Sequence, residues 1–534
     1  MTGVVLLFVA LAAVMTWPQA IHLTTHARDH HDVYFNMWRL AWAAHAFATG
    51  PRHLFDGNMF FPEIRTLTLS DAMFVEALLA APLLWIGLPQ VLVHNLLLLG
   101  GIVASAVGAF VLARHLTGCT SAAITAGIVF AFAPYRFEHY MHLELQWAMW
   151  APWALWALHR TFETGSRGMG VLTGVFVALQ TMSSIYYGIF LMVLLSLCAG
   201  LLMLSSGRAG VMRVTVPLAA GAFTAAVACG AYAVPYLATR GEVGGRSEDE
   251  IRVYSATPAN YRVATPDNLL YGARSGRLLG RPERRLFPGV VPLLLGVMAF
   301  MLRRPSRDAI VYVLCAVAAF DMSLGFGGIS YRFLYEHVPL FGGLRAPARL
   351  GIFVLLFLGV VAALGQAAIF EEVPQRGRRV AAVIIPSLVL LEYWVAPIQL
   401  TTFPSAPPPL YAWLAAQPHG VVAEFPMPSP NTLPGREARY LYMSTFHWKP
   451  IVNGYSGYYP QSYIARLEQL SRFPDIESLE RLHREEVRYL IVHTASYPRD
   501  EAELVLSGIS ASGAARELGH FDDGEGTAVV FGLR

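Results

Sequence analysis

The chain has 534 residues, and its composition indicates an integral membrane protein. Hydrophobic residues make up 55% of it, charged residues only 14%, and the mean hydropathy is +0.47. The formal net charge of +3 is too small and too dispersed to indicate a nucleic-acid partner. All four cysteines lie within or beside apolar runs, so we expect no disulfide framework.

Eleven apolar runs predict a polytopic, mainly α-helical membrane domain, because a spanning helix needs about 20 mainly apolar residues. The first run lacks a preceding basic segment and a small-residue cleavage site, so we expect an uncleaved anchor. The runs lie near residues 3–21, 91–113, 120–135, 147–160, 169–185, 188–204, 214–236, 288–302, 308–325, 348–370 and 380–397.

The arginines predict the orientation, because short cytoplasmic loops carry an excess of positive residues. If the N-terminus is inside, the long segments 22–90, 236–287 and 398–534 all lie outside. The protein would then lie in a cytoplasmic (inner) membrane, with its N-terminus on the cytoplasmic side. The short loops on the inner side would hold Arg114, Arg160, Arg167, Arg208, Arg213, Arg303, Arg304, Arg307, Arg376, Arg378 and Arg379.

The apolar run 72–88 decides this topology, because one more span would move every later loop to the other side. It follows Asp71 and contains Glu76 and Pro82. We therefore expect an amphipathic helix that lies at the outer membrane surface. Asp71 and Glu76 would either orient this helix or support a nearby active site.

The first external segment opens with the sequence Asp29-His30-His31-Asp32. An ionised carboxylate at the bilayer centre costs roughly 2.5–3.5 kcal/mol, so these acids should lie at the membrane surface. A membrane enzyme could hold its catalytic base there, although the acids could also simply solvate a helix end. His30 and His31 could bind a divalent metal, since imidazole and carboxylate are ordinary ligands, but adjacent residues rarely converge on one ion.

Two further groups are candidates for substrate binding. The turn 135–146 contains His139, His142 and Glu144, and the predicted topology places it on the same side as the acidic segment. Arg345 and Arg349 are four residues apart, so on a helix they would share a face and could contact lipid head groups.

After residue 397 the composition changes to that of a soluble α/β domain. Residues 421–425, 487–493 and 528–531 read as strands, and 476–486 reads as a helix. We expect two domains: a membrane domain over 1–397 that carries the external loop 22–90, and an extracytoplasmic domain over 398–534. Aromatic residues are dense in this second domain, which would suit carbohydrate binding or simply an aromatic core.

The order of these features resembles the GT-C membrane glycosyltransferases and, more narrowly, the bacterial RgtA/B/C/D-like group. The resemblance covers most of the chain. The matching pieces are Asp32-x-x-x-Asn36-x-Trp38-x-x-x-Trp42, Phe55-Asp56-Gly57-Asn58, Phe61-Pro62, Pro82-Leu-Leu-Trp-Ile-Gly87, Leu112-Ala-Arg-His-Leu-Thr-Gly118, Phe130-Ala-Phe-Ala-Pro-Tyr-Arg136 and Leu344-Arg-Ala-Pro-Ala-Arg349.

This resemblance implies an enzyme that takes a sugar from a polyprenyl-phosphate donor on the outer face of the membrane and passes it to a lipid, glycan or protein acceptor. It implies an acidic base at the start of the first external loop. Asp32 matches best, and Asp29 is the alternative. The family often has a paired acidic doublet here, whereas two histidines separate these acids. The positive groups that would stabilise the donor phosphate are Arg345, Arg349, His139 and His142, with Glu144 beside them.

Two other functions remain open at this point. A transporter or flippase for a lipid-linked glycan would require paired charges within the spans and internal repeats, which are not clear in the sequence. A non-catalytic membrane assembly protein of cell-envelope biogenesis would tolerate the loss of Asp32.

Overall fold

The computed structural model describes residues 1–275, 281–302 and 304–533, so Arg303 lies outside the described residues. The chain forms two compact units. The first contains 1–21, 96–234 and 244–399, and the second contains 22–95, 235–243 and 400–534. This division differs from the expected one, because the loop that we assigned to the membrane domain belongs to the same unit as the C-terminal region.

Backbone hydrogen bonds explain why the first loop and the C-terminal region form one unit. Strand β1 (His26–Ala27) pairs antiparallel with β2 (Thr401–Thr402). The Phe60 N–H donates to the Asn453 carbonyl at 2.9 Å, and the Ile451 N–H donates to the Asn58 carbonyl at 2.8 Å. Such backbone pairing cannot be read from side-chain patterns, which is why the sequence did not reveal it.

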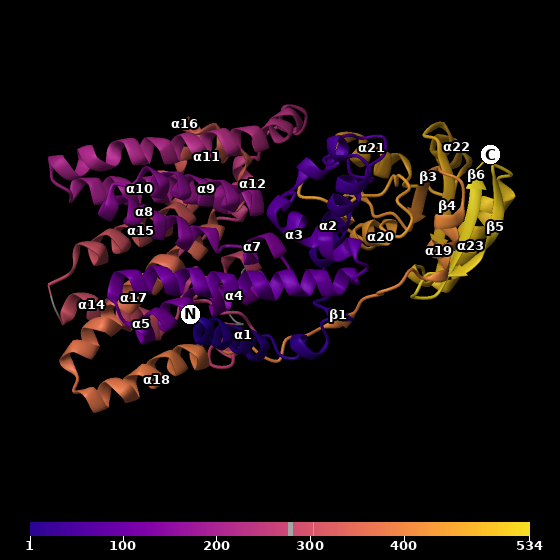
Figure 1. The fold of residues 1–534 in the computed structure, drawn as a ribbon. Coiled ribbons are helices and arrows are strands. Elements are labelled where there is room, and N and C mark those ends of the chain that lie inside the picture. The colour runs from indigo at the N-terminus through magenta and orange to yellow at the C-terminus, as the bar shows by residue number, and fades with distance from the viewer. Residues whose placement is uncertain (276–280, 303, 534) are drawn as a thin grey trace. The chain divides into compact units, whose positions relative to one another are not determined.

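Each of the eleven predicted membrane runs forms a helix (Figure 1). Helix α4 begins in the second unit and α11 ends there, and the other nine lie in the first unit. The helices are α1 (Thr2–Met15), α4 (Gln90–Thr117), α5 (Thr120–Phe132), α8 (Trp150–Thr164), α9 (Arg167–Ser183), α10 (Ile185–Leu204), α11 (Arg208–Val243), α14 (Val290–Met301), α15 (Arg307–Ser323), α17 (Gly351–Glu372) and α18 (Gln375–Glu392).

Among the described residues, four helical segments are long and apolar enough to cross a membrane. They are Gln90–Thr117, Ile185–Leu204, Arg208–Glu242 and Pro347–Glu372. Helices α1 and α14 are apolar but shorter. The protein is therefore a mainly helical membrane protein, and the number of eleven spans stays a prediction.

Close backbone contacts hold the first unit together. Helix α17 packs against α5, α14 and α15. At Gly365 of α17 an added Cβ would lie 1.8 Å from the Leu295 carbonyl oxygen of α14, so only glycine fits. Gly170 of α9 meets the Pro217 carbonyl of α11 in the same way. Small residues of this kind let membrane helices approach closely.

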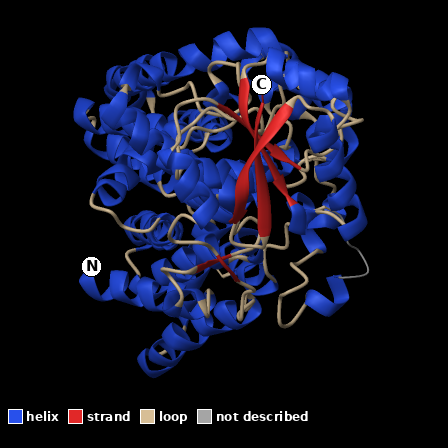
Figure 2. Ribbon diagram, turned by 90° about the vertical axis from the view of Figure 1, so that its right-hand side faces the viewer, coloured by secondary structure: helices blue, strands red, loops and turns tan. Residues whose placement is uncertain are grey.

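A four-stranded sheet forms the core of the C-terminal part of the second unit (Figure 2). The strand order is β3-β4-β6-β5, with β3 and β4 parallel and the other pairs antiparallel. The sequence predicted β3 (Val421–Phe425), β4 (Val487–His493), β6 (Thr527–Leu533) and α22 (Ile476–Arg484). It did not predict β5 (Ala515–Asp522), α19 (Pro409–Ala416), α20 (Glu437–Ser444), α21 (Gln461–Gln469) or α23 (Arg499–Ala511).

Two helices of the first loop, α2 (His31–Thr49) and α3 (Phe74–Trp85), pack against each other. Helix α3 has 12 residues, too few to cross a bilayer at 1.5 Å per residue. Its outward face is apolar, with Leu78, Leu79 and Trp85 exposed, whereas Glu76 points inward and is buried. Helix α3 thus has an exposed apolar face and a buried face, and its position at the outer membrane surface stays a prediction.

Candidate functional site

The Asp32 carboxylate lies in the first turn of α2. His30 is the N-cap residue of this helix, and its Nδ1 accepts a hydrogen bond from the Asp32 N–H at 3.1 Å. A negative charge in the first turn is favoured by the positive end of the helix dipole. The His-His-Asp sequence thus fixes the backbone on which the predicted base stands.

The Asp32 side chain is hydrogen-bonded and still reachable. The Tyr455 hydroxyl donates to Asp32 Oδ1 at 2.8 Å. His30 Nδ1 lies 3.2 Å from Asp32 Oδ2, but a ring nitrogen that accepts from a backbone N–H carries no proton to donate. The Asp32 side chain keeps 18% of its surface exposed. A partly exposed carboxylate held in one orientation can accept a proton from a substrate hydroxyl.

Asp29, the alternative base, lies in the loop before α2 and is exposed. Its charge acts on His31. Burial lowers the pKa of the His31 ring and His30 lowers it further, whereas Asp32 and Asp29 raise it. The structure therefore places both acids near His31, but it gives Asp32 the more ordered setting.

Aromatic rings line the rest of α2. Trp38 is fully buried, stacks on Phe35 with 5.7 Å between ring centroids, and donates from Nε1 to Asn58 Oδ1 at 3.0 Å. Trp42 stacks on Trp38 at 6.2 Å. Trp38 belongs to the core of the second unit. The spacing Asn36-x-Trp38-x-x-x-Trp42 serves packing.

Asp71 and Glu76 lie in the same unit as Asp32. The Asp71 backbone carbonyl accepts a hydrogen bond from Arg39 Nη1 at 2.5 Å. Glu76 is fully buried in the first turn of α3. The Arg39 guanidinium is itself buried and lies 4.5 Å from the centre of the Phe35 ring. Sequence reasoning missed Arg39, although an arginine in the middle of an apolar helix is a signal for a buried polar network.

The predicted groups His139, His142 and Glu144 lie in the first unit: the two histidines between α6 (Pro134–Glu138) and α7 (Leu143–Gln146), and Glu144 in the first turn of α7. The two Nδ1 atoms of His139 and His142 are 3.4 Å apart, so one ring can donate to the other. Glu144 is buried. Buried Arg136 holds this turn closed by donating to the carbonyl oxygens of residues 145 and 146, each at 2.9 Å.

Arg345 and Arg349 also lie in the first unit, each between an acid and an aromatic ring. The Arg349 guanidinium lies 4.8 Å from the centre of the Tyr186 ring, with Nη2 3.8 Å from a Glu283 carboxylate oxygen. Arg345 stands in the same way over Tyr254, 5.2 Å from the ring centre. At 3.8 Å this ion pair is loose, and the Arg349 side chain is buried.

Sequence reasoning missed a tighter ion pair in the first unit. Arg285 Nη1 donates to both carboxylate oxygens of Glu138, at 2.8 and 3.0 Å, and both side chains are largely buried. The two residues are far apart in the sequence, so no local pattern could reveal their contact.

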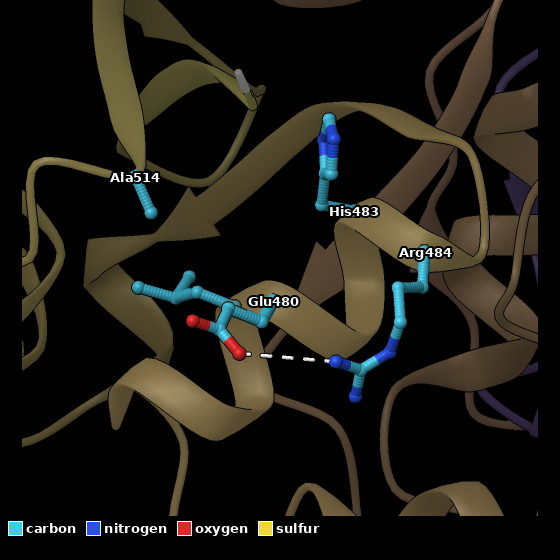
Figure 3. Close-up of a pocket in the computed structure, with 5 residues that line it drawn as sticks. Glu480, His483, Arg484 and Ala514 are labelled. Atoms are coloured by element: carbon cyan, nitrogen blue, oxygen red, sulfur yellow. Dashed lines mark ion pairs between the residues drawn. The ribbon is translucent and has the colours of Figure 1, made fainter.

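The described residues contain no group of three or more His, Cys, Asp or Glu side chains arranged to hold a metal ion. The geometry therefore gives no support to His30 and His31 as metal ligands. A pocket of about 260 Å³ lies at the surface of the second unit (Figure 3). It is lined by Leu479, Glu480, His483, Arg484 and Ala514, and none of these is a predicted site residue.

A buried network beside the sheet was also missed. His493, at the end of β4, has Nδ1 2.5 Å from Asp523 Oδ2 and Nε2 2.9 Å from Glu424 Oε2. Burial alone would lower the pKa of His493, but the hydrogen bonds and negative charges of the two carboxylates raise it. The signal in the sequence was a glutamate within the apolar strand Val421–Phe425, which must find a partner when buried.

No protein-family model and no curated protein matches this chain. Solved structures do match. The arabinofuranosyltransferase AftD from Mycobacteria superposes with a TM-score of 0.66 at 15% identity, over 100% of this chain and 39% of AftD. The apo oligosaccharyltransferase of Archaeoglobus fulgidus superposes with a TM-score of 0.50 at 12% identity, over 92% of this chain and 69% of that enzyme. At these identities the likeness establishes a shared fold, and the chain spans well under half the length of AftD.

Proposed function

We propose that this chain, which has the GT-C fold predicted from its sequence, is a membrane glycosyltransferase. The observation that carries the proposal is the Asp32 carboxylate, which is partly exposed, hydrogen-bonded and fixed at the start of α2. The two solved structures described above are both named as enzymes that transfer a sugar or an oligosaccharide. The rest of the proposal concerns the donor, the acceptor and the membrane face.

The donor is a polyprenyl-phosphate sugar, and the reaction takes place on the outer face of the bacterial cytoplasmic membrane. Asp32 removes the proton of an acceptor hydroxyl, and the resulting oxygen forms a bond to the anomeric carbon. The bond from that carbon to the donor phosphate breaks, and its electron pair leaves with the polyprenyl phosphate. Arg345 and Arg349, with His139 and His142, stabilise the phosphate charge. The acceptor is a lipid, a glycan or a protein.

The proposed topology places the N-terminus inside and residues 398–534 outside. It rests on the eleven predicted spans and on the arginines of the short loops. Reporter fusions after Arg208 and after Arg379 should read as cytoplasmic, and a fusion at Arg534 should read as external. A cytoplasmic reading at Arg534 would place the Asp32 site on the wrong side and would contradict the proposal.

Glu392, a buried acid at the end of α18 (Gln375–Glu392), makes contacts that stabilise the fold. Glu392 of α18 accepts the backbone N–H groups of Val290 and Val291, at 2.6 and 3.0 Å. These are the first residues of α14, whose amide groups have no partner within the helix. Glu392 therefore caps α14, and this observation supports the enzyme over a transport pathway.

The experiment that tests the function uses purified full-length protein in membranes that contain a native lipid extract. Transfer of labelled sugar from a panel of polyprenyl-phosphate sugars is measured for the wild type, Asp32→Asn and Asp29→Asn. Asp500→Asn is the matched control, because Asp500 is an exposed acid in the first turn of α23 in the same unit.

We expect Asp32→Asn to lose at least about 100-fold in turnover, since general-base catalysis contributes roughly 10²–10⁴-fold. Asp500→Asn should keep the wild-type rate. Undiminished turnover of Asp32→Asn together with loss in Asp29→Asn would move the base to Asp29. Undiminished turnover in both variants would exclude both acids as the catalytic base. A wild type that transfers sugar from no donor would favour the transport or assembly functions.

A further inference from the structure

We propose that Tyr455, in the C-terminal region, is a positioning residue for Asp32, so that loop 453–460 forms part of the active site. The inference rests on the proposed function, in which Asp32 is the base. The residues are more than 400 positions apart in the sequence, and both belong to the second unit.

The contact between the two side chains is specific. The Tyr455 hydroxyl donates to Asp32 Oδ1 at 2.8 Å, and the Tyr455 ring stands edge-on to Phe35 of α2, with 5.3 Å between centroids. It also lies 6.1 Å from the His31 ring. The ring contacts hold the Tyr455 hydroxyl in place, and its hydrogen bond orients the Asp32 carboxylate.

The backbone before Tyr455 is itself held in place. The Gly454 N–H donates to a Glu437 carboxylate oxygen at 2.7 Å, and Asn453 Nδ2 donates to the other oxygen at 3.1 Å. Asn453 also exchanges two hydrogen bonds with the Glu424 backbone, at 2.8 and 2.9 Å. A Cβ at Gly454 would lie 2.3 Å from the Phe60 ring, so the chain can pass here only as glycine. The loop is therefore anchored on both side-chain and backbone contacts.

This arrangement has a chemical consequence. A hydroxyl that donates to a carboxylate stabilises its ionised form, which is the form that can take a proton from the acceptor. Loss of the hydroxyl alone should also let the carboxylate turn away from the acceptor, so kcat should fall while substrate binding stays intact.

The test is Tyr455→Phe, which keeps the ring contacts and removes only the donor. Tyr489→Phe is the matched control, because the Tyr489 hydroxyl donates one hydrogen bond of 2.9 Å to the Pro418 carbonyl in the same unit. Sugar transfer by full-length protein gives kcat and KM. Carbodiimide labelling, which modifies protonated carboxyl groups, is measured by peptide mass spectrometry from pH 4 to 8 and reports Asp32 and Asp29 separately. The titratable groups around Asp32 include His30 and His31, and Asp29 acts on His31; all three are unchanged in both variants.

We expect Tyr455→Phe to lower kcat by roughly 10-fold or more with KM little changed, since a hydrogen bond to a charged group has about that effect. The pH midpoint of Asp32 labelling should rise by about one unit, and that of Asp29 should stay. Tyr489→Phe should change neither kcat nor the Asp32 labelling midpoint. An unmoved Asp32 midpoint in Tyr455→Phe would overturn the inference whatever the activity. If the Asp32 midpoint rises in Tyr455→Phe but the wild-type protein transfers no sugar, the proposed function is refuted and the contact between Tyr455 and Asp32 still stands.

Discussion

Glu437 should make the stability of the second unit fall as the pH rises. Its carboxyl group is fully buried on α20, where it accepts hydrogen bonds from Gly454 and Asn453. Burial raises the pKa of Glu437 from 4.5 to about 8, although the hydrogen bonds oppose this shift. At neutral pH the folded protein thus keeps a proton that the unfolded chain releases.

The magnitude follows from this difference. One pKa unit corresponds to about 1.4 kcal/mol, so a pKa of about 8 against 4.5 amounts to about 5 kcal/mol. Because the folded pKa is raised, the stabilisation is complete below pH 4.5 and is lost as the pH rises to 8. Glu437→Gln keeps the size of the side chain and has no charge to bury. The difference in free energy of unfolding between this variant and the wild type should therefore grow in favour of the variant by roughly 4 kcal/mol from pH 5 to pH 8.5.

The assay is thermal unfolding of the full-length protein in detergent micelles, followed by tryptophan fluorescence at pH 5 and pH 8.5. For units of 150–250 residues 1 kcal/mol moves Tm by about 2–4 °C, so the Tm of Glu437→Gln should rise against the wild type by roughly 10 °C between these pH values. Other groups titrate equally in both proteins and cancel in the comparison. An equal Tm difference at both pH values would refute the reasoning.

Two further changes test the packing of each unit. His493→Phe should lower the free energy of unfolding by about 3–5 kcal/mol, because it leaves two buried carboxylates without the imidazole that bonds to both. Urea unfolding of the second unit measures this change. A loss below about 1 kcal/mol would contradict the network. Gly365→Ala should destabilise the first unit, since its Cβ would lie 1.8 Å from the Leu295 carbonyl, whereas Gly296→Ala in α14 has its nearest neighbours at 3.6 Å and should be tolerated. Similar Tm values for the two glycine variants would show that α14 and α17 are packed differently.

Features with a local physical cause could be predicted from the sequence. Apolar runs long enough to be membrane helices form helices, and the strands 421–425 and 487–493 have the predicted ends, because alternation and run length depend on neighbours in the chain. Asp32 was predicted to lie at the membrane surface after the first helix, and the helix α2 in whose first turn it stands was not predicted. Its buried aromatic and polar residues do not form an apolar stripe.

Features that depend on distant residues could not be predicted. The contact of Tyr455 with Asp32 and the pairing of β1 with β2 each join segments about 400 residues apart, and nothing in either segment specifies the other. His493 gave a partial signal, because a buried histidine at the end of a strand needs partners. Their identity, however, is set by the strand order β3-β4-β6.

The grouping of the first loop with the C-terminal region changes the role that the latter can have. A separate domain over 398–534 could bind carbohydrate or control access of the acceptor without contacting the base. The hydrogen bonds between residues 58–61 and 451–453, and that of Tyr455 to Asp32, make it part of the frame that holds the proposed base. Substitutions in loop 453–460 should therefore act mainly on kcat, whereas a domain that only admitted the acceptor would change KM. Measuring both constants for Tyr455→Phe separates these two roles, and a raised KM with unchanged kcat would restore the view of an independent domain.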